Sequence, residues 1–465
     1  MATRRNADGP TTTIDRTVPG LAARQVAHAA VADLLVQGRA FALEDALAKA
    51  GLDAGLDAAD ASLARAIATA TFRRLGFLRR MLAARMTQGL PPDQPRLVAL
   101  LVTGAAQILD LNVPDHAAVD LSVRLAKGDP YLQHTPGLVN AILRRVIRER
   151  DAIAAEASDP LGQNTPDWLA ARWSAAYGPD TARAIASAHL SGAALDITPR
   201  GSVAEWAERL GGVALPTGSI RLHEVRSAVS DLPGYGEGAW WVQDAAAAIP
   251  ARLLAVGPGQ RVADLCAAPG GKTAQLAAAG AEVVAVDRSA PRLERLAENL
   301  ARLGLTAEIR VGDATQLPET DADAFDAVLL DAPCSATGTI RRHPDVAWTK
   351  AGGDVGRLGG LQRRLLDRAA TLVKPGGRLV YCTCSLEPEE GEGQIAAFLA
   401  RNPAFERLPI RSEEVGGLGE LINGDGDLRT LPSHLSGETT GGEGDLPVVR
   451  GGIDGFFASR LIRKA

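Results

Sequence analysis

The sequence predicts two folds in series, an all-α bundle followed by a doubly wound α/β domain, with a small α+β subdomain between them. Over residues 20–150 apolar residues recur at helical spacing, and no alternating strand pattern interrupts them. From residue 236 onwards short β-rich runs alternate with helical runs, which is typical of a mostly parallel Rossmann-like sheet. A hydrophobic fraction of 46% with 23% charged residues excludes wholesale disorder.

The start of the chain and its cysteines indicate a reducing, aqueous setting. Residues 1–19 are basic with no apolar stretch behind them, so we expect a flexible tail and no signal peptide. The best apolar run, residues 97–109, is shorter than the roughly 20 residues that span a bilayer. Four cysteines, all after residue 260, cannot form a disulfide framework, and they lack the spacing of a zinc site. We therefore expect a cytoplasmic protein with no membrane partner and no metal.

Residues 20–150 are predicted to form the helical bundle, with glycines and prolines separating its helices. Residues 1–150 carry 19 Lys and Arg against 14 Asp and Glu, although the whole chain has a net charge of −5. Arginines gather in two expected helices, where they form basic faces suited to a phosphate backbone. Ordinary solvated faces are the alternative. The two groups are Arg73, Arg74, Arg79, Arg80 and Arg85, and Arg144, Arg145, Arg148 and Arg150.

Three further regions complete the chain. Residues 151–190 are expected to be a helical linker, and residues 191–235 a small α+β subdomain in which LDITPR and SIRLHEV are strands around one helix. Residues 236–465 are expected to form the α/β domain. Within it, residues 433–453 interrupt the closing motifs and are predicted to alter a substrate-side loop.

Four acids end four successive predicted strands of this domain. Asp264, Asp287, Asp313 and Asp331 would therefore meet at the carboxyl edge of the sheet, where ligands of such folds bind. Asp287 follows Asp264 by 23 residues, close to the spacing of acids that bind a ribose diol. The slot suits S-adenosyl-L-methionine, whose amino-acid end fits a glycine turn. That turn follows the first strand and comprises Cys266, Ala267, Ala268, Pro269, Gly270, Gly271 and Lys272.

Two cysteines are predicted at neighbouring strand ends beside this slot, Cys334 in DAPCSATG and Cys384 in YCTCS. A lone cysteine is usually a small core residue, but two beside a methyl donor suggest a nucleophile and its helper. Cytosine C5 is too electron-poor to take a methyl group until a thiolate has added to C6. A base must then remove the C5 proton, so the reaction uses two groups in separate steps.

The segment Asn112 to Arg150 resembles the antitermination factor NusB. There V-P-x-H-A-A-V opens one helix and G-(F/L)-V-N-A-(I/V)-L-R opens the last. The resemblance implies a helical RNA-binding module over residues 20–150, in which His116 has a structural role. The matching residues are Pro114, His116, Val119, Gly137, Val139, Asn140, Leu143 and Arg144.

The motifs DLCAAPGGKT, LLDAPCSATGTIRRHPDVAW and YCTCSLEPEE resemble the RNA cytosine-C5 methyltransferases of the Sun/RsmB type. The resemblance implies that Cys384 is the nucleophile and that Cys334 assists product release. It places cofactor contacts on the loop Cys266–Lys272 and on Asp287, Asp313 and Asp331. Asp331 is also expected to take part in catalysis, because it lies close to where the target base enters. It implies 16S ribosomal RNA, or an early small-subunit assembly intermediate, as the partner.

Some points stay open at this stage. Cys382 stands where the family usually has Ser or Ala, and Lys272 either pairs with a carboxylate or contacts substrate. WWVQDAAA, residues 240–247, resembles an entry motif beside the cofactor, but its tryptophans would equally suit a core. A tRNA or 23S rRNA cytosine-C5 methyltransferase is an alternative function. A non-catalytic RNA-binding assembly or antitermination factor is another, although the intact acids, cysteines and glycine turn argue against it.

Overall fold

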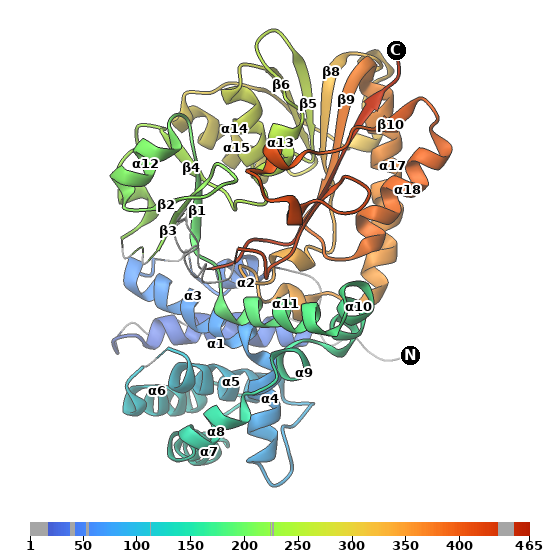
Figure 1. Cartoon of the computed structure of the whole chain (residues 1–465). Helices are drawn as coiled ribbons and strands as arrows, with labels where there is room; N and C mark the ends of the chain where they lie inside the picture. Colours follow the sequence, from blue (N-terminus) through green and yellow to red (C-terminus); the bar gives the residue numbers. More distant parts are fainter. Residues whose placement is uncertain are drawn as a thin grey trace, which may run out of the picture. The chain divides into compact units, whose positions relative to one another are not determined.

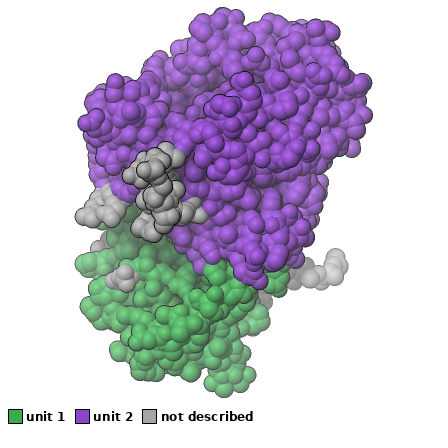
Figure 2. Space-filling view, viewed as in Figure 1, with its two compact units in different colours: residues 1–170, 343–350 green, residues 171–342, 351–465 purple. Residues whose placement is uncertain are grey.

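The computed structural model describes residues 17–37, 42–52, 55–111, 113–223, 225, 227–435 and 451–465. The chain divides into two compact units, residues 1–170 with 343–350 and residues 171–342 with 351–465 (Figure 2). Most of the predicted tail, residues 1–19, and most of the predicted loop, residues 433–453, lie outside the described residues. Across the described ranges, no helix has the length and apolar character needed to cross a membrane.

The first unit is helical throughout the part that the structure describes (Figure 1). Its central helix is α5, in which every residue from Leu97 to Ile108 is buried, so the longest apolar run of the sequence lies in the core. Five other helices, α1, α3, α4, α6 and α7, contact α5. The helices are α1 (Leu21–Gln37), α2 (Leu43–Lys49), α3 (Ala58–Arg73), α4 (Leu75–Ala84), α5 (Pro95–Leu109), α6 (Asp115–Gly128), α7 (Pro136–Arg148), α8 (Arg150–Glu156), α9 (Pro160–Asn164) and α16 (Val346–Thr349).

Part of the predicted basic surface of this unit is used internally. Arg85 is buried and pairs with Glu149 at 2.9 Å and with Glu156 at 2.8 Å. Arg74 pairs with Asp110 at 2.6 Å. The arginine bunches are therefore partly structural. The exposed arginines of the two groups are Arg79, Arg80, Arg144, Arg145, Arg148 and Arg150.

A short segment from the second half of the sequence completes the helical unit. Residues 343–350 cluster with residues 1–170. The Trp348 indole N–H donates to the Phe72 carbonyl oxygen at 3.0 Å, and the Asp345 carboxylate accepts from the Leu43 backbone N–H at 3.0 Å. The helical unit thus contains part of the RRHPDVAW motif, which the sequence analysis assigned wholly to the α/β domain.

The second unit begins within helix α10 (Asp167–Tyr177) and continues with α11 (Pro179–Ser191). A small antiparallel sheet of order β2-β3-β1-β4 follows. β4 lies beyond residue 235, where the predicted subdomain ended, because a strand of three residues shows no alternating pattern. The region predicted as a linker forms α8 to α11. The small sheet and its helix comprise β1 (Leu195–Pro199), α12 (Val203–Leu210), β2 (Val213–Ala214), β3 (Ile220–Leu222) and β4 (Trp240–Val242).

The large sheet has the order β10-β12-β9-β8-β5-β6-β7, with β11 paired to β12. Its strands β5 to β9 are parallel, and β10, β11 and β12 run antiparallel to their neighbours. The strands are β5 (Arg261–Leu265), β6 (Glu282–Asp287), β7 (Glu308–Val311), β8 (Phe325–Asp331), β9 (Val373–Thr383), β10 (Phe405–Arg407), β11 (Leu428–Thr430) and β12 (Phe456–Arg463). This is the mostly parallel Rossmann-like sheet that the sequence predicts.

Helices cover both faces of the large sheet (Figure 1). In β6 the buried Val283 and Ala285 pack with α13, α14 and α15, whereas Val284 and Val286 pack with α17 and α18. Successive residues of a strand point to opposite faces, so a strand buried on both faces reads as a continuous apolar run. These helices are α13 (Ile249–Leu253), α14 (Gly271–Ala278), α15 (Ala290–Leu303), α17 (Gly352–Leu372) and α18 (Glu392–Arg401).

Candidate active site

The two predicted reactive cysteines lie together at the carboxyl ends of neighbouring strands. β8 ends at Asp331, shortly before Cys334, and β9 ends at Thr383, directly before Cys384. The strands are parallel neighbours, with Asp331 opposite Cys382. The Sγ atoms of Cys334 and Cys384 are 3.5 Å apart, within hydrogen-bonding distance. Residues 50 positions apart in the sequence therefore form one site.

The contact between the thiols gives them different roles. Hydrogen bonding to Cys384 is the largest cause that raises the pKa of Cys334 well above its usual value, and burial is the next. The hydrogen bond can run in either direction between the two sulfur atoms, and it favours the protonated form of Cys334. A thiolate is the nucleophilic form of cysteine, so a Cys334 that stays protonated leaves Cys384 as the candidate attacking group.

Two cations interact electrostatically with Cys384. Burial by itself would lower the pKa of Lys272, but Asp331, and after it the two cysteines Cys382 and Cys384, raise it above its usual value. Burial is also outweighed at Arg342, where Asp454 and Asp244, with a smaller contribution from Cys384, raise the pKa. Both side chains therefore stay cationic.

Asp331 is held from two sides. The Lys272 ammonium donates to Oδ2 at 2.7 Å, and its Nζ lies 4.9 Å from the centre of the Phe456 ring. The Cys382 thiol donates to Oδ1 with a sulfur–oxygen distance of 3.5 Å. Of the two roles left open for Lys272, pairing with a carboxylate is the one present here.

Cys382 has a different environment from Cys384. Its side chain is fully buried on β9, and burial, followed by the charge of Asp331, raises its pKa well above the usual value. Cys382 is therefore a neutral hydrogen-bond donor to Asp331. Cys384, one residue beyond the strand, is partly exposed. This difference in access supports the assignment of the nucleophile to Cys384.

Asp264, at the end of β5, is a completely buried carboxyl group. The Thr273 hydroxyl donates to its Oδ2 at 2.6 Å, whereas Oδ1 has no hydrogen-bond partner among the described residues. Burial raises the pKa of Asp264 to about 7. A buried acceptor without a donor is costly, so this oxygen suits a cationic or N–H group of a ligand.

The predicted glycine turn connects β5 to α14. Cys266 and Gly270 both have left-handed backbone angles, with φ of 62° and 103°, and a Cβ on Gly270 would lie 2.6 Å from Leu296. Asp287, at the end of β6, accepts hydrogen bonds from the backbone N–H groups of Ala268 at 3.2 Å and Ser289 at 2.9 Å. The second acid thus also fixes the turn after the first strand.

Asp313 follows β7 at the edge of a cavity of about 590 Å³. Its carboxylate accepts from the backbone N–H and the hydroxyl of Thr315, and these hydrogen bonds lower its pKa. The cavity adjoins the ends of β6 and β7. It is lined by Val286, Arg310, Val311, Gly312, Asp313, Gln316, Leu317, Pro318, Thr320 and Asp321.

A buried ion network beside the cysteines was missed by the sequence analysis. The guanidinium of Arg341 is completely buried. It donates a hydrogen bond to the Asp244 carboxylate, and its Nε donates to Asp454 Oδ1 at 2.9 Å. The Arg342 Nε donates to the other oxygen of Asp454 at 2.7 Å. These residues belong to the motifs TIRRHPD, WWVQDAAA and DGFF. Complementary charges in these three motifs were the signal, but spacing alone could not pair them.

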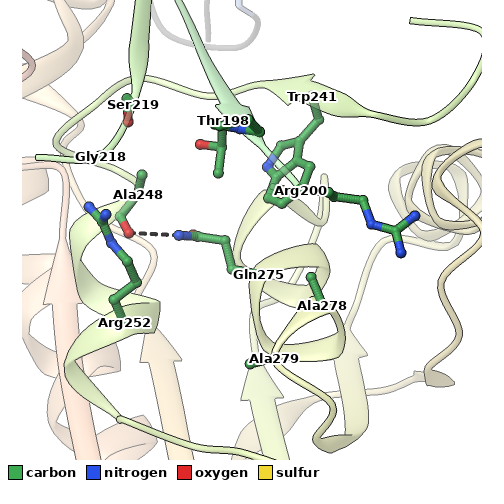
Figure 3. Close-up of a pocket in the computed structure, with 11 residues that line it drawn as sticks. Thr198, Arg200, Gly218, Ser219, Trp241, Ala248, Arg252, Gln275, Ala278 and Ala279 are labelled. Carbon is green, nitrogen blue, oxygen red and sulfur yellow. Dashed lines mark hydrogen bonds between the residues drawn. The ribbon is translucent and has the colours of Figure 1, made fainter. Parts of the chain in front are cut away.

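The tryptophans of WWVQDAAA are core residues. Trp240 and Trp241 are 0% and 5% exposed, and the Trp241 indole N–H donates to Gln243 at 2.8 Å. Trp241 also lines a separate cleft of about 360 Å³, in which Gln275 donates to the Ala248 carbonyl oxygen (Figure 3). None of the predicted site residues lines this cleft. In the described part of the chain, no cluster of three or more His, Cys, Asp or Glu side chains is arranged to hold a metal.

Fold and site together define a methyltransferase-like sheet with an appended helical unit, and comparisons with known proteins agree. Residues 251–440 match the family model "16S rRNA methyltransferase RsmB/F", and residues 21–148 match the NusB family. "Ribosomal RNA small subunit methyltransferase B" of Cronobacter sakazakii is 35% identical over 87% of this chain and 91% of its own length. The protein of the same name from Sodalis glossinidius is 36% identical over 95% of this chain and 98% of its own.

Two solved structures share the fold. PH0851 superposes over 96% of this chain and 99% of its own with a TM-score of 0.72 at 24% identity. A methyltransferase homolog protein from Pyrococcus horikoshii has a TM-score of 0.51 at 28% identity, over 63% of this chain and 94% of its own. The chain belongs to the RsmB/F family of 16S rRNA methyltransferases and carries a NusB-family segment before the catalytic domain. The resemblances predicted from the motifs are thereby confirmed.

Proposed function

We propose that this rRNA methyltransferase transfers a methyl group from S-adenosyl-L-methionine to C5 of one cytosine in 16S rRNA, through a covalent bond between Cys384 and C6. The observation that carries the proposal is the 3.5 Å separation of the Cys334 and Cys384 sulfur atoms at neighbouring strand ends. A single nucleophilic or core cysteine would not need a second thiol at this distance.

The proposed reaction uses both thiols. The Cys384 thiolate forms a bond to C6, and the electrons of the C5–C6 double bond make C5 nucleophilic. S-Adenosylmethionine, when bound, supplies the electrophilic methyl group, leaving a neutral thioether as its by-product. A base then takes the C5 proton, the C5–C6 double bond re-forms, and the electrons of the C6–S bond return to Cys384 as the thiolate.

We assign the removal of the C5 proton to Cys334, because of its hydrogen bond with Cys384. In the free enzyme Cys384 is the main reason for the high pKa of Cys334. When Cys384 bonds to C6 its sulfur becomes a neutral thioether, which removes this cause. The pKa of Cys334 then falls towards that of an ordinary buried thiol. The Cys334 thiol can then give up its own proton to water, and the thiolate that this leaves takes the C5 proton.

Residues along the strand ends fit the proposed methyl donor. The Oδ1 of Asp264, which has no hydrogen-bond partner among the described residues, would accept from its ammonium, and the turn from Cys266 to Lys272 would hold the amino-acid end. Asp287 would accept from the ribose hydroxyls, because each carboxylate oxygen can accept more than one hydrogen bond. The cavity beside Asp313 would take the adenine. Asp331, fixed by Lys272, is assigned to the target-base side of the slot.

The partner proposed is 16S rRNA or an early small-subunit assembly intermediate. The relatives from Cronobacter and Sodalis are named for the small-subunit RNA, and the exposed arginines of α4 and α7 suit a phosphate backbone. A base must leave its stack to reach Cys384, so a single-stranded or flexible target is expected. Methylation of tRNA or 23S rRNA, and a non-catalytic assembly role, are the alternatives that the experiment must separate.

The deciding experiment is methyl transfer from labelled S-adenosylmethionine to unmodified 16S rRNA, 23S rRNA, tRNA and small-subunit assembly intermediates. We expect 5-methylcytidine, identified by nucleoside mass spectrometry, only in the 16S rRNA of one or both small-subunit substrates. Label in 23S rRNA or tRNA would move the substrate to the alternative class. RNA binding without any transfer would favour the non-catalytic role.

A further inference from the structure

A buried carboxylate connects the loops that carry the two reactive cysteines. Glu390 follows β9 in the motif YCTCSLEPEE, and its side chain is 0% exposed. The Ser335 backbone N–H donates to both of its oxygens, at 3.0 and 3.1 Å. The hydroxyls of Ser335 and Ser385 also donate to Oε2, the latter at 2.6 Å. Gln362 of α17 donates to Oε1 at 3.0 Å.

Both serines directly follow a reactive cysteine. Ser335 follows Cys334 in the chain, and Ser385 follows Cys384. The Glu390 carboxylate therefore accepts hydrogen bonds from both loops that carry the cysteines. The backbone of Glu390 is fixed as well, because its carbonyl oxygen accepts from the Tyr381 hydroxyl at 2.8 Å and from Thr383 at 3.2 Å. The carboxylate is thus anchored to the strand that ends at Cys384.

We propose that Glu390 is a positioning residue that holds the Cys334 and Cys384 thiols at reacting distance without contacting substrate. This inference rests on the proposed two-cysteine reaction and deepens it. The order of steps needs the base close to the nucleophile, since both groups act on one ring. A displacement of about 1 Å in such a pair costs roughly a hundredfold in rate.

The donor set explains why this position holds a carboxylate. Backbone and amide N–H groups can only donate, and two of them, from Ser335 and Gln362, point at Oε1. Only the hydroxyl groups at Oε2 can reverse and accept. Glu390→Gln can therefore keep an oxygen at the position of Oε1 and place its NH₂ group at the position of Oε2. There the NH₂ group and the Ser335 N–H are both donors and cannot form a hydrogen bond with each other. We expect this variant to fold with the two loops less firmly connected.

The first test measures the distance between the thiols without any turnover. Phenylarsine oxide binds two thiols that lie close together, and peptide mapping by mass spectrometry identifies a bridged pair. We expect bridging of Cys334 with Cys384 in the wild type and at least a fivefold lower yield in Glu390→Gln. The matched control is Glu389→Gln. Glu389 is the preceding residue, and its side chain is 59% exposed and pairs with Arg172. It should bridge like the wild type.

The second test measures the reaction. Glu390→Gln should lower kcat about 10- to 100-fold while KM for S-adenosylmethionine and for RNA changes less than threefold. A double variant, Ser335→Ala with Ser385→Ala, removes only the two hydroxyl donors and should lower bridging and kcat in the same direction. It keeps the proposal testable if Glu390 variants do not fold.

The outcomes separate this inference from the proposed function. Unchanged bridging and kcat in folded Glu390→Gln, or in the serine double variant if the former does not fold, would overturn the positioning role. An enzyme that never yields 5-methylcytidine would overturn the proposed function, whereas reduced bridging in the same variants would still support Glu390 as the residue that sets the thiol distance.

Discussion

Among the described residues, the two units of this protein bury charged side chains to different extents. The core of the helical unit is one cluster dominated by aliphatic residues from its helices, although Arg24, Arg85 and Asp129 are also buried in this unit. The catalytic unit divides its core between the two faces of the sheet and, in addition, buries charged groups at the strand ends, among them Asp264, Arg341, Glu390 and Asp454. Apolar burial is non-directional, whereas buried charges need specific partners. The first unit should therefore tolerate change by repacking, and the second should not.

The largest expected effect separates chemistry from folding within the catalytic unit. Cys384→Ala removes the sulfur that we propose as the attacking group, so methyl transfer should fall by about 10⁴-fold or more with the thermal unfolding midpoint nearly unchanged. Cys334→Ala should instead leave a protein–RNA adduct that survives denaturing electrophoresis, because elimination stalls. Normal turnover by the Cys334 variant without an adduct would contradict its role as the base.

The sequence predicted this pair of cysteines but not what surrounds it. Strand alternation and the glycine turn were enough to bring Cys334, Cys384 and the four strand-end acids to one edge, because parallel strands all end there. Which charges pair is a question of side-chain geometry. Arg341 with Asp454, 113 positions apart, and Ser335 with Glu390, 55 apart, have no local signal.

In the helical unit, too, the sequence did not predict which charged side chains pair with each other. Periodicity predicted its helices, but whether an arginine faces solvent or a carboxylate depends on the tertiary fold. Arg85 lies in a bunch that suggested an RNA surface, and it is buried between Glu149 and Glu156. Residues 343–350 were assigned by sequence order to the α/β domain, because continuity along the chain hides a segment that packs elsewhere.

The second prediction breaks the buried ion network. Asp454→Asn turns an acceptor for two guanidinium groups into a partial donor, leaving the completely buried Arg341 and the partly exposed Arg342 poorly compensated. The free energy of unfolding should fall by about 3–5 kcal/mol, measured by chemical denaturation. The control is Asp180→Asn at the exposed pair with Arg183, which should change it by less than about 1 kcal/mol. If Asp454→Asn and Asp180→Asn lowered the free energy of unfolding equally, the buried ion network would contribute no more to stability than an exposed ion pair.

The third prediction tests the aliphatic core of the helical unit. Leu100 is fully buried in α5, so Leu100→Ala should lower the free energy of unfolding of this unit by about 2–4 kcal/mol. The loss should shrink in Leu100→Met, because the aliphatic packing around this position can adapt to a side chain of similar volume. Leu138→Ala, at a position 40% exposed in α7, is the control. A Leu100→Met variant as unstable as the alanine variant would show that this core is as specific as the charged one.

The fourth prediction concerns pH. Burial raises the pKa of Asp264 from 3.8 to about 7, so between these pH values the folded chain holds a proton that the unfolded chain has lost. The free energy of unfolding should therefore fall as pH rises through this window, by at most about 1.4 kcal/mol per pH unit from this group. Asp264→Asn should flatten that part of the pH–stability curve. Asp313→Asn should not, because hydrogen bonds from Thr315 lower the pKa of Asp313.

The smallest expected effect separates the two kinds of arginine in the helical unit. Arg148 is exposed at the end of α7 without an ion pair among the described residues, whereas Arg85 is buried and paired. If the exposed arginines contact phosphates, Arg148→Gln should reduce the slope of log binding constant against log salt concentration for 16S rRNA by about one. Arg85→Gln should lower stability and leave that slope unchanged. Filter binding at several salt concentrations measures both slopes, and an unchanged slope for Arg148→Gln would place the RNA contact on another face. Because one phosphate contact changes affinity only slightly at any single salt concentration, the slope carries the distinction that a single binding constant would miss.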